Sequence, residues 1–328
     1  MQTMPVEPEA RVQAMFDLGP RTPSKRMLVI VNPYATTVSD RLKNLVVYAL
    51  RGSYEVDAID TERREHATEL CREAAQEGYD VVVAFGGDGT VNEAANGLAG
   101  SGVPLTCLPG GRTNVFCRIL GIPNDVVDAT EHLLRLADDW RPREIDLGRA
   151  GERHFTFSAG VGLDASVVEV VDAHPRLKAR LGEYYYTWVA TGTFTRRYLL
   201  RPPRLEAVLA GERVPGVTAI VQNAAPYTYF GERPVEIGEG ASLNSGDLAG
   251  VVLQRARPVD LPTVAWRALS GRARVANHGQ VHPFSGIESL VVRSLDERPL
   301  PIQVDGDYIG TADQVEFAVV RRALTVVA

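Results

Sequence analysis

An apolar run that ends in glycine constrains this chain more than any other feature. Residues 81–90 read VVVAFGGDGT, so five apolar residues lead directly into two glycines, an aspartate and a third glycine. A short apolar run bounded by glycine predicts a strand buried on both faces, as in a parallel sheet. Because Val91–Leu98 follows with helical spacing, we expect a strand, a tight turn and a helix.

The residues of this turn indicate what it could bind. Gly86, Gly87 and Gly89 allow the main chain to approach a phosphate closely, and the amides at a helix N-terminus attract anions. Asp88 would repel a phosphate unless a metal ion or a transferred proton is involved. The combination favours magnesium-dependent nucleotide chemistry. A plain strand-to-helix turn with a capping aspartate is the alternative for these four residues alone.

The order of strand and helix signals along the chain divides it into two domains with different secondary structure. From residue 26 to about 144, strand and helix signals alternate, which predicts parallel strands covered by helices. Ligands bind such open sheets beyond the carboxyl ends of the strands. The expected strands are Met27–Val31, Tyr54–Ile59, Tyr79–Phe85 and Pro104–Leu108, and the expected helices are a Ser39- or Asp40-capped one ending at Leu50, Glu65–Gln76 and Val91–Leu98.

Residues 145–328 instead carry short β-rich runs punctuated by Gly, Asn, Asp and Pro, which predicts an antiparallel sandwich or barrel-like domain. Helical stretches are expected near Ala165–Val171 and Gly182–Tyr198, and residues 1–25 are expected to form a loosely ordered arm. The expected strands are His154–Ala159, Arg204–Ala210, Gly216–Gln222, Leu248–Leu253, Ser289–Val292, Ile302–Val304 and Val315–Val320.

The net charge limits which partners the protein is expected to bind, and the cysteine content indicates its compartment. A net charge of −6 argues against nucleic-acid binding, and three cysteines without a CxxC pair favour reduced thiols in a cytoplasmic protein. Residues 176–204 are an exception to the acidic character, with seven basic side chains against Glu183 and six aromatic rings among them. Such a segment favours transient contact with a membrane surface, although an ordinary helix with buried rings is the alternative.

The longer string GGDGTVNEAANGL resembles the glycine-rich signature of the diacylglycerol kinase catalytic domain family, which includes bacterial lipid kinases and sphingosine kinases. The likeness extends upstream to VNPYATT and TERREHATEL and downstream to LPGGRTNVFCRILGIP. SAGVGLDASV, VQNAAPYTYFG and VDGDYIG then follow in the order that family shows, so the resemblance covers roughly residues 26–328.

This resemblance implies an α/β nucleotide-binding domain, similar to that of NAD kinases and diacylglycerol kinases, a β-rich lipid-substrate domain, and an active site in the cleft between them. ATP and Mg²⁺ are the implied cofactors. The implied catalytic residues are Asp88 and Asp307, and the implied metal ligands are Asp88 and Asp247. The residues expected at the nucleotide are Asn32, Thr61, Gly86, Gly87, Asp88, Gly89, Thr90, Glu93, Gly111, Arg112 and Asn114.

The chain also departs from the family pattern. Asp307 stands where the family usually has glutamate, and Val115 stands where an aspartate would follow Asn114. Asn244 and Ser245 replace a pair of aspartates, which weakens the expectation of a structural metal beside Asp247.

Three functions are compatible with these residues. The first is an ATP-dependent lipid kinase acting on diacylglycerol or a related lipid alcohol, cytoplasmic with peripheral membrane association. The second is an NAD kinase-like enzyme, which Asn92 and Glu93 directly after the turn disfavour. The third is a catalytically weak lipid- or nucleotide-binding protein, suggested by the departures at Val115, Asn244 and Ser245. The identity of the lipid and a homodimeric state are left open.

Overall fold

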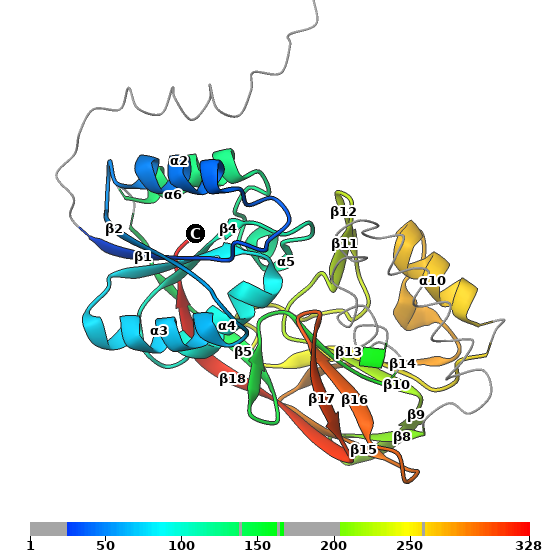
Figure 1. The fold of residues 1–328 in the computed structure, drawn as a ribbon. Coiled ribbons are helices and arrows are strands. Elements are labelled where there is room, and N and C mark those ends of the chain that lie inside the picture. Colours follow the sequence, from blue (N-terminus) through cyan, green and yellow to red (C-terminus); the bar gives the residue numbers. More distant parts are fainter. Residues whose placement is uncertain (1–24, 138–139, 163–164, 167–203, 258–259) are drawn as a thin grey trace, which may run out of the picture. The chain divides into compact units, whose positions relative to one another are not determined.

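The chain folds into two compact units. The structure, a computed structural model, describes residues 25–137, 140–162, 165–166, 204–257 and 260–328 (Figure 1). The first unit comprises the described residues up to Ile145 together with the C-terminal Ala323–Ala328, and the second comprises those from Asp146 to Arg322. The chain therefore passes from one unit to the other twice.

The first unit is built on a parallel sheet, as the apolar run at residues 81–85 predicts. The strands are β1 (Arg26–Val31), β2 (Glu55–Asp60), β3 (Val81–Gly86) and β4 (Leu105–Pro109), in the order β2-β1-β3-β4. Every residue of β3 and β4 is buried. The C-terminus of the chain joins the same sheet, where Val326 pairs in parallel with Leu105.

Helices cover both faces of this sheet, which confirms the doubly wound α/β prediction. Figure 1 shows α2 (Asp40–Leu50) and α6 (Val126–Leu136) over one face, and α3 (His66–Glu77) and α4 (Asp88–Leu98) over the other. A short helix, α5 (Val115–Ile119), follows β4. The Ser39 hydroxyl accepts the Leu42 amide at 3.2 Å and so caps α2 as the sequence predicts. Helix α4 begins at Asp88, three residues earlier than its periodicity indicates.

The second unit is an antiparallel β-sandwich, which confirms the predicted class. One sheet has the order β14-β13-β10-β7-β16-β17, and β18, β15, β8 and β9 pair in sequence in the other. A separate hairpin is formed by β11 (Thr228–Phe230) and β12 (Arg233–Val235). The strand bounds are β5 (Arg143–Ala150), β6 (Arg153–Phe155), β7 (Ser158–Gly162), β8 (Leu205–Leu209), β9 (Glu212–Gly216), β10 (Thr218–Gln222), β13 (Leu248–Leu253), β14 (Val281–Ile287), β15 (Ser289–Ser294), β16 (Leu300–Val304), β17 (Asp307–Ala312) and β18 (Gln314–Val326).

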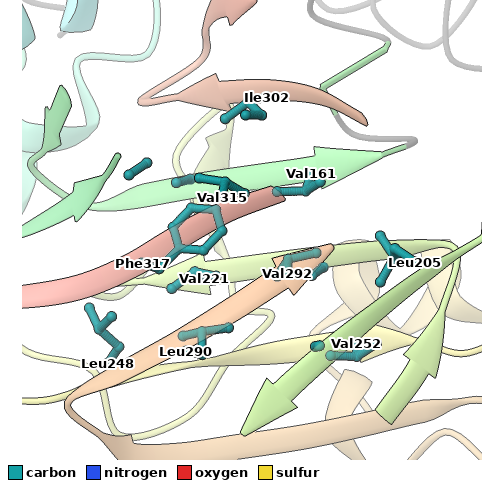
Figure 2. Close-up of a cluster of buried hydrophobic side chains, with 14 of the residues drawn as sticks. Val161, Leu205, Val221, Leu248, Val252, Leu290, Val292, Ile302, Val315 and Phe317 are labelled. Atoms are coloured by element: carbon teal, nitrogen blue, oxygen red, sulfur yellow. The ribbon is translucent and has the colours of Figure 1, made fainter. Parts of the chain in front are cut away.

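Side chains from both sheets meet in the core of this unit. Figure 2 shows Phe317 of β18 among branched aliphatic side chains, including Leu290 of β15 and Val221 of β10. The ring of Phe155 meets that of Phe317 edge to face, with centroids 6.5 Å apart. Interdigitation of two inner faces is the packing that defines a sandwich, and it explains the alternating burial along β8.

Four sequence expectations fall wholly or mostly outside the described residues. These are the arm at residues 1–25, the helices at Ala165–Val171 and Gly182–Tyr198, and the basic aromatic segment at residues 176–204, of which only Lys25, Ala165, Ser166 and Arg204 are described. Helix α10 (Leu261–Ser270) and the 3₁₀ turn η3 (Val275–Asn277) were not anticipated. None of the helices in the described ranges is both long and apolar enough to cross a bilayer.

Helices α3 and α4 pack so closely that one glycine cannot be replaced without strain. A Cβ atom at Gly97 would lie 2.5 Å from the Cβ of Cys71 and 2.5 Å from the carbonyl oxygen of Thr68. The carbonyl belongs to the backbone of α3 and cannot rotate away. The contact therefore fixes the distance between the two helices on this face of the sheet.

We expect Gly97→Ala to destabilise the protein by roughly 1–3 kcal/mol, the usual cost of overpacking. Chemical denaturation followed by circular dichroism measures the difference. Gly279→Ala is the control, because its added Cβ would meet nothing within 4 Å at an ordinary φ. Equal stability of the two variants would contradict the close packing.

Candidate functional site

The carboxyl edge of the parallel sheet gathers most of the residues that the sequence singles out. Asn32 follows β1, Thr61 follows β2, and Gly87 and Gly110 follow β3 and β4. In the order β2-β1-β3-β4 the chain moves to one side of β1 for β2 and to the other side for β3. The edge between β1 and β3 is therefore a topological switch point, where open α/β sheets bind ligands.

Two glycine pairs meet at this edge, backbone against backbone. The Gly110 amide donates to the Gly86 carbonyl at 2.8 Å, and a Cβ at Gly110 would lie 2.8 Å from the Cα of Gly86. A Cβ at Gly111 would likewise lie 3.0 Å from the Cα of Gly87. Side chains at Gly110 and Gly111 would therefore collide with or crowd the loop after β3, and the two loops meet here as bare main chain.

Helix α4 starts at this surface. Gly87 is its N-cap, in extended conformation and without a capping side chain. The first turn, Asp88 to Thr90, therefore directs its backbone amides toward the edge, where the helix dipole favours negative charge. An anion such as a phosphate group is the ligand that such a turn suits.

Asn32 and Thr90 connect the end of β1 to the glycine turn that follows β3. The Asn32 side-chain amide donates to the Thr90 hydroxyl at 3.0 Å, and its backbone amide donates to the Phe85 carbonyl at 2.9 Å. Its Oδ1 accepts the amide of Tyr34 at 3.0 Å. Thr61, whose amide donates to the Val31 carbonyl, lies on the far side of β1. Asn32 therefore fixes the position of the glycine turn as well as lining the edge.

Asp88 is half-buried and anchors a second helix. Its Oδ1 accepts the Phe116 amide of α5 at 3.1 Å, which ties the start of α4 to α5. Beneath it, the thiols of Cys107 and Cys117 are buried and in contact. The hydrogen bond between them, burial and the nearby Asp88 charge raise the pKa of Cys117 well above its usual value. The Cys117 thiol is therefore neutral, and Asp88 is the carboxylate beside it.

The loop after β4 is held by Asn114. Its Oδ1 accepts the Gly111 amide at 2.8 Å, and its side-chain amide donates to the Gly111 carbonyl and to Asn124. Asn114 is 2% exposed and adopts a left-handed φ of 46°. Val115 is equally buried, so the position where the resemblance leads us to expect an aspartate faces the interior. Arg112 is exposed on the same loop.

Glu93 has a contact that the sequence did not reveal. Its carboxylate accepts the Ala67 amide at 3.2 Å, in the first turn of α3, whose own N-cap lacks a capping bond. The Glu93 carbonyl also accepts the hydroxyl of Thr68. Burial, reinforced by the charge of Glu93, raises the pKa of Cys71 to about 12. Glu93 thus caps α3, and its part in nucleotide binding stays a prediction.

The remaining two predicted carboxylates belong to the second unit. Asp307 is half-buried at the start of β17, opposite Val304 in the hairpin register. Asp247 is half-buried at the end of a loop, and the carbonyl of its neighbour Gly246 accepts two hydrogen bonds from the Arg321 guanidinium. A cation of the chain itself therefore contacts this loop.

The described residues offer few side chains that could bind a metal ion. The part of the chain that the structure describes holds no group of three or more His, Cys, Asp or Glu side chains placed for a metal ion. Mg²⁺ in phosphoryl-transfer sites is often held by only one or two carboxylates, with phosphate oxygens and water completing the shell. The half-buried Asp88 fits that role, whereas Asp247 has no carboxylate cluster around it.

Two aspartates that the sequence analysis did not select are buried and fully engaged. Asp305 accepts the amides of Thr156, Phe157 and Ser158 and the Thr156 hydroxyl, at 2.6 to 3.0 Å. Asp146 accepts the amides of Gly246 and Arg322, both at 2.8 Å. The Asp-Gly pair at residues 305–306 is a hairpin-turn signal that would have marked the first of them. Nothing local in the sequence marks the second.

Comparison with known proteins points to one family. The model of the "Diacylglycerol kinase catalytic domain" matches residues 26–150. A diacylglycerol kinase of Bacillus subtilis (strain 168) is 28% identical over 295 residues, covering 87% of this chain and 91% of that protein. One from Staphylococcus haemolyticus (strain JCSC1435) is 26% identical, covering 82% and 77%. The crystal structure of a diacylglycerol kinase from Bacillus anthracis str. Sterne has the same fold, with a TM-score of 0.67 at 24% identity over 93% of this chain and 98% of that one.

The Asp305 contacts generate a stability prediction. We expect Asp305→Asn to cost at least about 3 kcal/mol, because the new side-chain amide would set a donor against backbone donors in a buried place. Asp307→Asn, two residues away and half-exposed, should cost less than about 1 kcal/mol. Denaturant unfolding of both variants tests this. A variant at residue 305 as stable as the wild type would show that its carboxylate is not needed for the fold.

Proposed function

With residues 26–150 belonging to the diacylglycerol kinase catalytic domain family, we propose that the chain is an ATP-dependent lipid kinase. The proposed acceptor is the hydroxyl of diacylglycerol or a related lipid alcohol. The observation that carries the proposal is the turn at Gly86–Thr90, where bare main chain and a helix N-terminus meet at the switch point beside Asp88. Relatives named diacylglycerol kinase, similar over most of their length, support it.

The proposed nucleotide site uses main chain more than side chains. The phosphates of ATP would lie on the amides of the first turn of α4, with the Gly110–Gly111 loop against their other side. Asn32 and Thr90 would border them, and Arg112, exposed on its loop, would contact a phosphate through its guanidinium group. Mg²⁺ would supply charge neutralisation at the phosphate oxygens, and Asp88 would hold it.

The proposed reaction is a direct transfer. The lipid hydroxyl oxygen forms a bond to the terminal phosphorus while the bond from that phosphorus to the bridging oxygen breaks, and ADP leaves with the electron pair. The hydroxyl proton passes to a carboxylate base, for which we propose Asp307. Its place matches the family's glutamate, and the residue is partly exposed at the start of β17.

We expect the purified protein to transfer label from ATP to diacylglycerol in mixed micelles containing Mg²⁺. Asp307→Asn should lower kcat by on the order of 100-fold or more, the usual contribution of a general base, while Asp307→Glu should retain activity. Asp88→Asn should also lose most turnover, although its Oδ1 can still accept the Phe116 amide and keep α5 in place. Full activity in either asparagine variant would remove that residue from the mechanism.

A second function, a catalytically weak lipid- or nucleotide-binding protein, is favoured by two structural observations. Val115 is buried where an additional carboxylate was expected, and the loop before Asp247 is held by Asp146 and Arg321. The labelling experiment separates the two functions, provided that a panel of lipid alcohols is tried and that nucleotide binding is measured by calorimetry in parallel. Nucleotide binding without transfer to any acceptor would favour this second function.

A further inference from the structure

Helix α10 lies in the connection between β13 and β14 of the second unit (Figure 1). Its two faces differ in their surroundings. On its inner face, Val264 and Ala268 pack against the buried Val217, Val251, Leu253, Val275 and Val281. The helix is therefore held in place by its own apolar cluster. Its outer face does not need to be apolar for the unit to fold.

The outer face is nevertheless apolar. Pro262, Ala265, Trp266 and Leu269 are exposed at a spacing that places them in one stripe along the helix. Trp266 is 53% and Leu269 51% exposed. Among the large apolar side chains exposed in the described ranges, these two are the pair that lies one turn apart on a single helix. Exposed apolar area arranged in this way marks an interaction surface.

Arginines surround this stripe in sequence. Residues 254–280 contain five arginines against the single Asp260, a net charge of +4 in a chain whose net charge is −6. Within the part of the chain that the structure describes, the exposed Arg255, Arg257 and Arg272 form no ion pair. The remaining two arginines make local contacts, Arg267 to the Arg274 carbonyl and Arg274 to Glu239.

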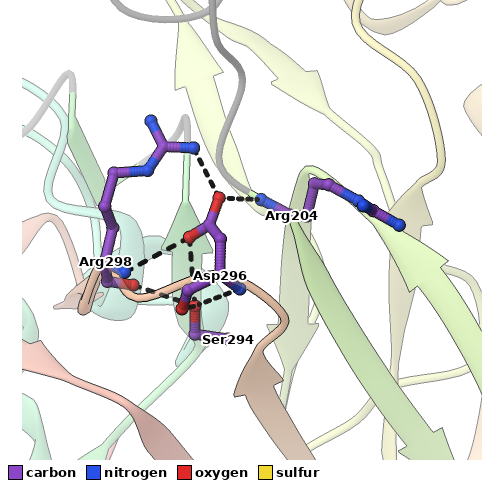
Figure 3. Close-up of polar contacts among 4 residues, drawn as sticks. All are labelled: Arg204, Ser294, Asp296 and Arg298. Atoms are coloured by element: carbon purple, nitrogen blue, oxygen red, sulfur yellow. Dashed lines mark hydrogen bonds and ion pairs between the residues drawn. The ribbon is translucent and has the colours of Figure 1, made fainter.

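A hollow of about 480 Å³ adjoins the base of this connection. It is lined by Arg204, Pro215, Gln254, Arg255, Gly279 and Gln280. Figure 3 shows the Arg204 side chain pointing away from Asp296, which binds only the Arg204 backbone amide among that residue's groups. Arg204 and Arg255 therefore both line a space that is large enough for a phosphate group.

We propose that the α10 surface, meaning the stripe Pro262, Ala265, Trp266 and Leu269 with the five arginines of residues 254–280, docks on an anionic lipid bilayer. Tryptophan and leucine enter the boundary between head groups and acyl chains, and arginines contact lipid phosphates. The proposal rests on the proposed function in one respect: an acceptor held in a bilayer gives such a surface its use.

Charge argues against a second copy of the chain as the occupant. A twofold dimer through this surface would place the same stripe, with its +4 segment, against itself. The positive charges of the two facing copies would repel each other and oppose association. An acidic bilayer offers the opposite charge and an apolar interior together, which matches both components of the α10 surface.

The test is sedimentation of the full chain with vesicles, without nucleotide. One set of vesicles is phosphatidylcholine alone, and the other contains about 30% phosphatidylglycerol to supply negative surface charge. The Trp266→Ala/Leu269→Ala variant should bind the anionic vesicles at least about tenfold more weakly, because two side chains no longer enter the bilayer. The matched control is Tyr48→Ser/Leu295→Ser, which removes two exposed apolar side chains elsewhere.

The arginines are tested separately. The Arg255→Gln/Arg257→Gln/Arg272→Gln variant should bind anionic vesicles on the order of 100-fold more weakly, at roughly fivefold per arginine, and the difference should shrink in high salt. Arg51→Gln/Arg72→Gln/Arg143→Gln changes the net charge equally at exposed positions of the first unit and should bind like the wild type. Thermal unfolding midpoints confirm that all variants are folded.

Two results would overturn the proposal. The first is unchanged vesicle binding in both α10 variants. The second is unchanged vesicle binding together with conversion of a dimer to a monomer in the Trp266/Leu269 variant, which would make the surface an interface between copies. Vesicle binding without kinase activity would contradict the proposed function alone, because sedimentation needs no turnover. If the α10 variants lose vesicle binding but keep full kinase activity on a dispersed short-chain lipid, the result would support both the docking proposal and the proposed function.

Discussion

The contact between two glycine pairs is the constraint on which the first unit's carboxyl edge depends. Gly86 and Gly110 approach so closely that a single Cβ would separate them, and the amide of one donates to the carbonyl of the other. This contact sets where β3 ends and α4 begins. Through Asp88 it also sets where α5 packs, and through Asn32 it fixes the neighbouring strand end. A surface of bare main chain at a switch point follows directly.

Burial sorts the aspartates of the chain into two groups. Asp305 and Asp146 are almost fully buried and accept several backbone hydrogen bonds each, so their carboxylates hold loops together. Asp88 and Asp307 are half-buried, at the first positions of a helix and of a strand. Of these four, Asp88 and Asp307 are the two whose residues are partly exposed. The division agrees with the roles that the family resemblance implies, although residue type alone does not distinguish the two groups.

The second unit combines a rigid sandwich with a surface of different chemistry. The sandwich core is closed by interdigitated side chains of both sheets, such as Phe155 and Phe317. Helix α10 of the β13–β14 connection packs on a second, smaller cluster that includes Val251 and Leu253 of β13. It is therefore free to carry apolar and basic side chains outward. Charge in this chain is thus distributed by region, and the net value of −6 includes a segment, residues 254–280, with a net charge of +4.

The local sequence pattern was sufficient to predict the fold class of each unit and the position of the glycine turn. Strand and helix periodicity and the properties of glycine act over only a few residues. The sequence by itself determined the parallel sheet, the antiparallel sandwich and the position of Asp88 at a strand-to-helix turn. Only the tertiary structure decided that Glu93 caps α3, that Asp146 holds residues more than ninety positions away, and that the last strand returns to the first unit. Those outcomes depend on which distant backbone groups arrive beside a side chain, and no local pattern records that.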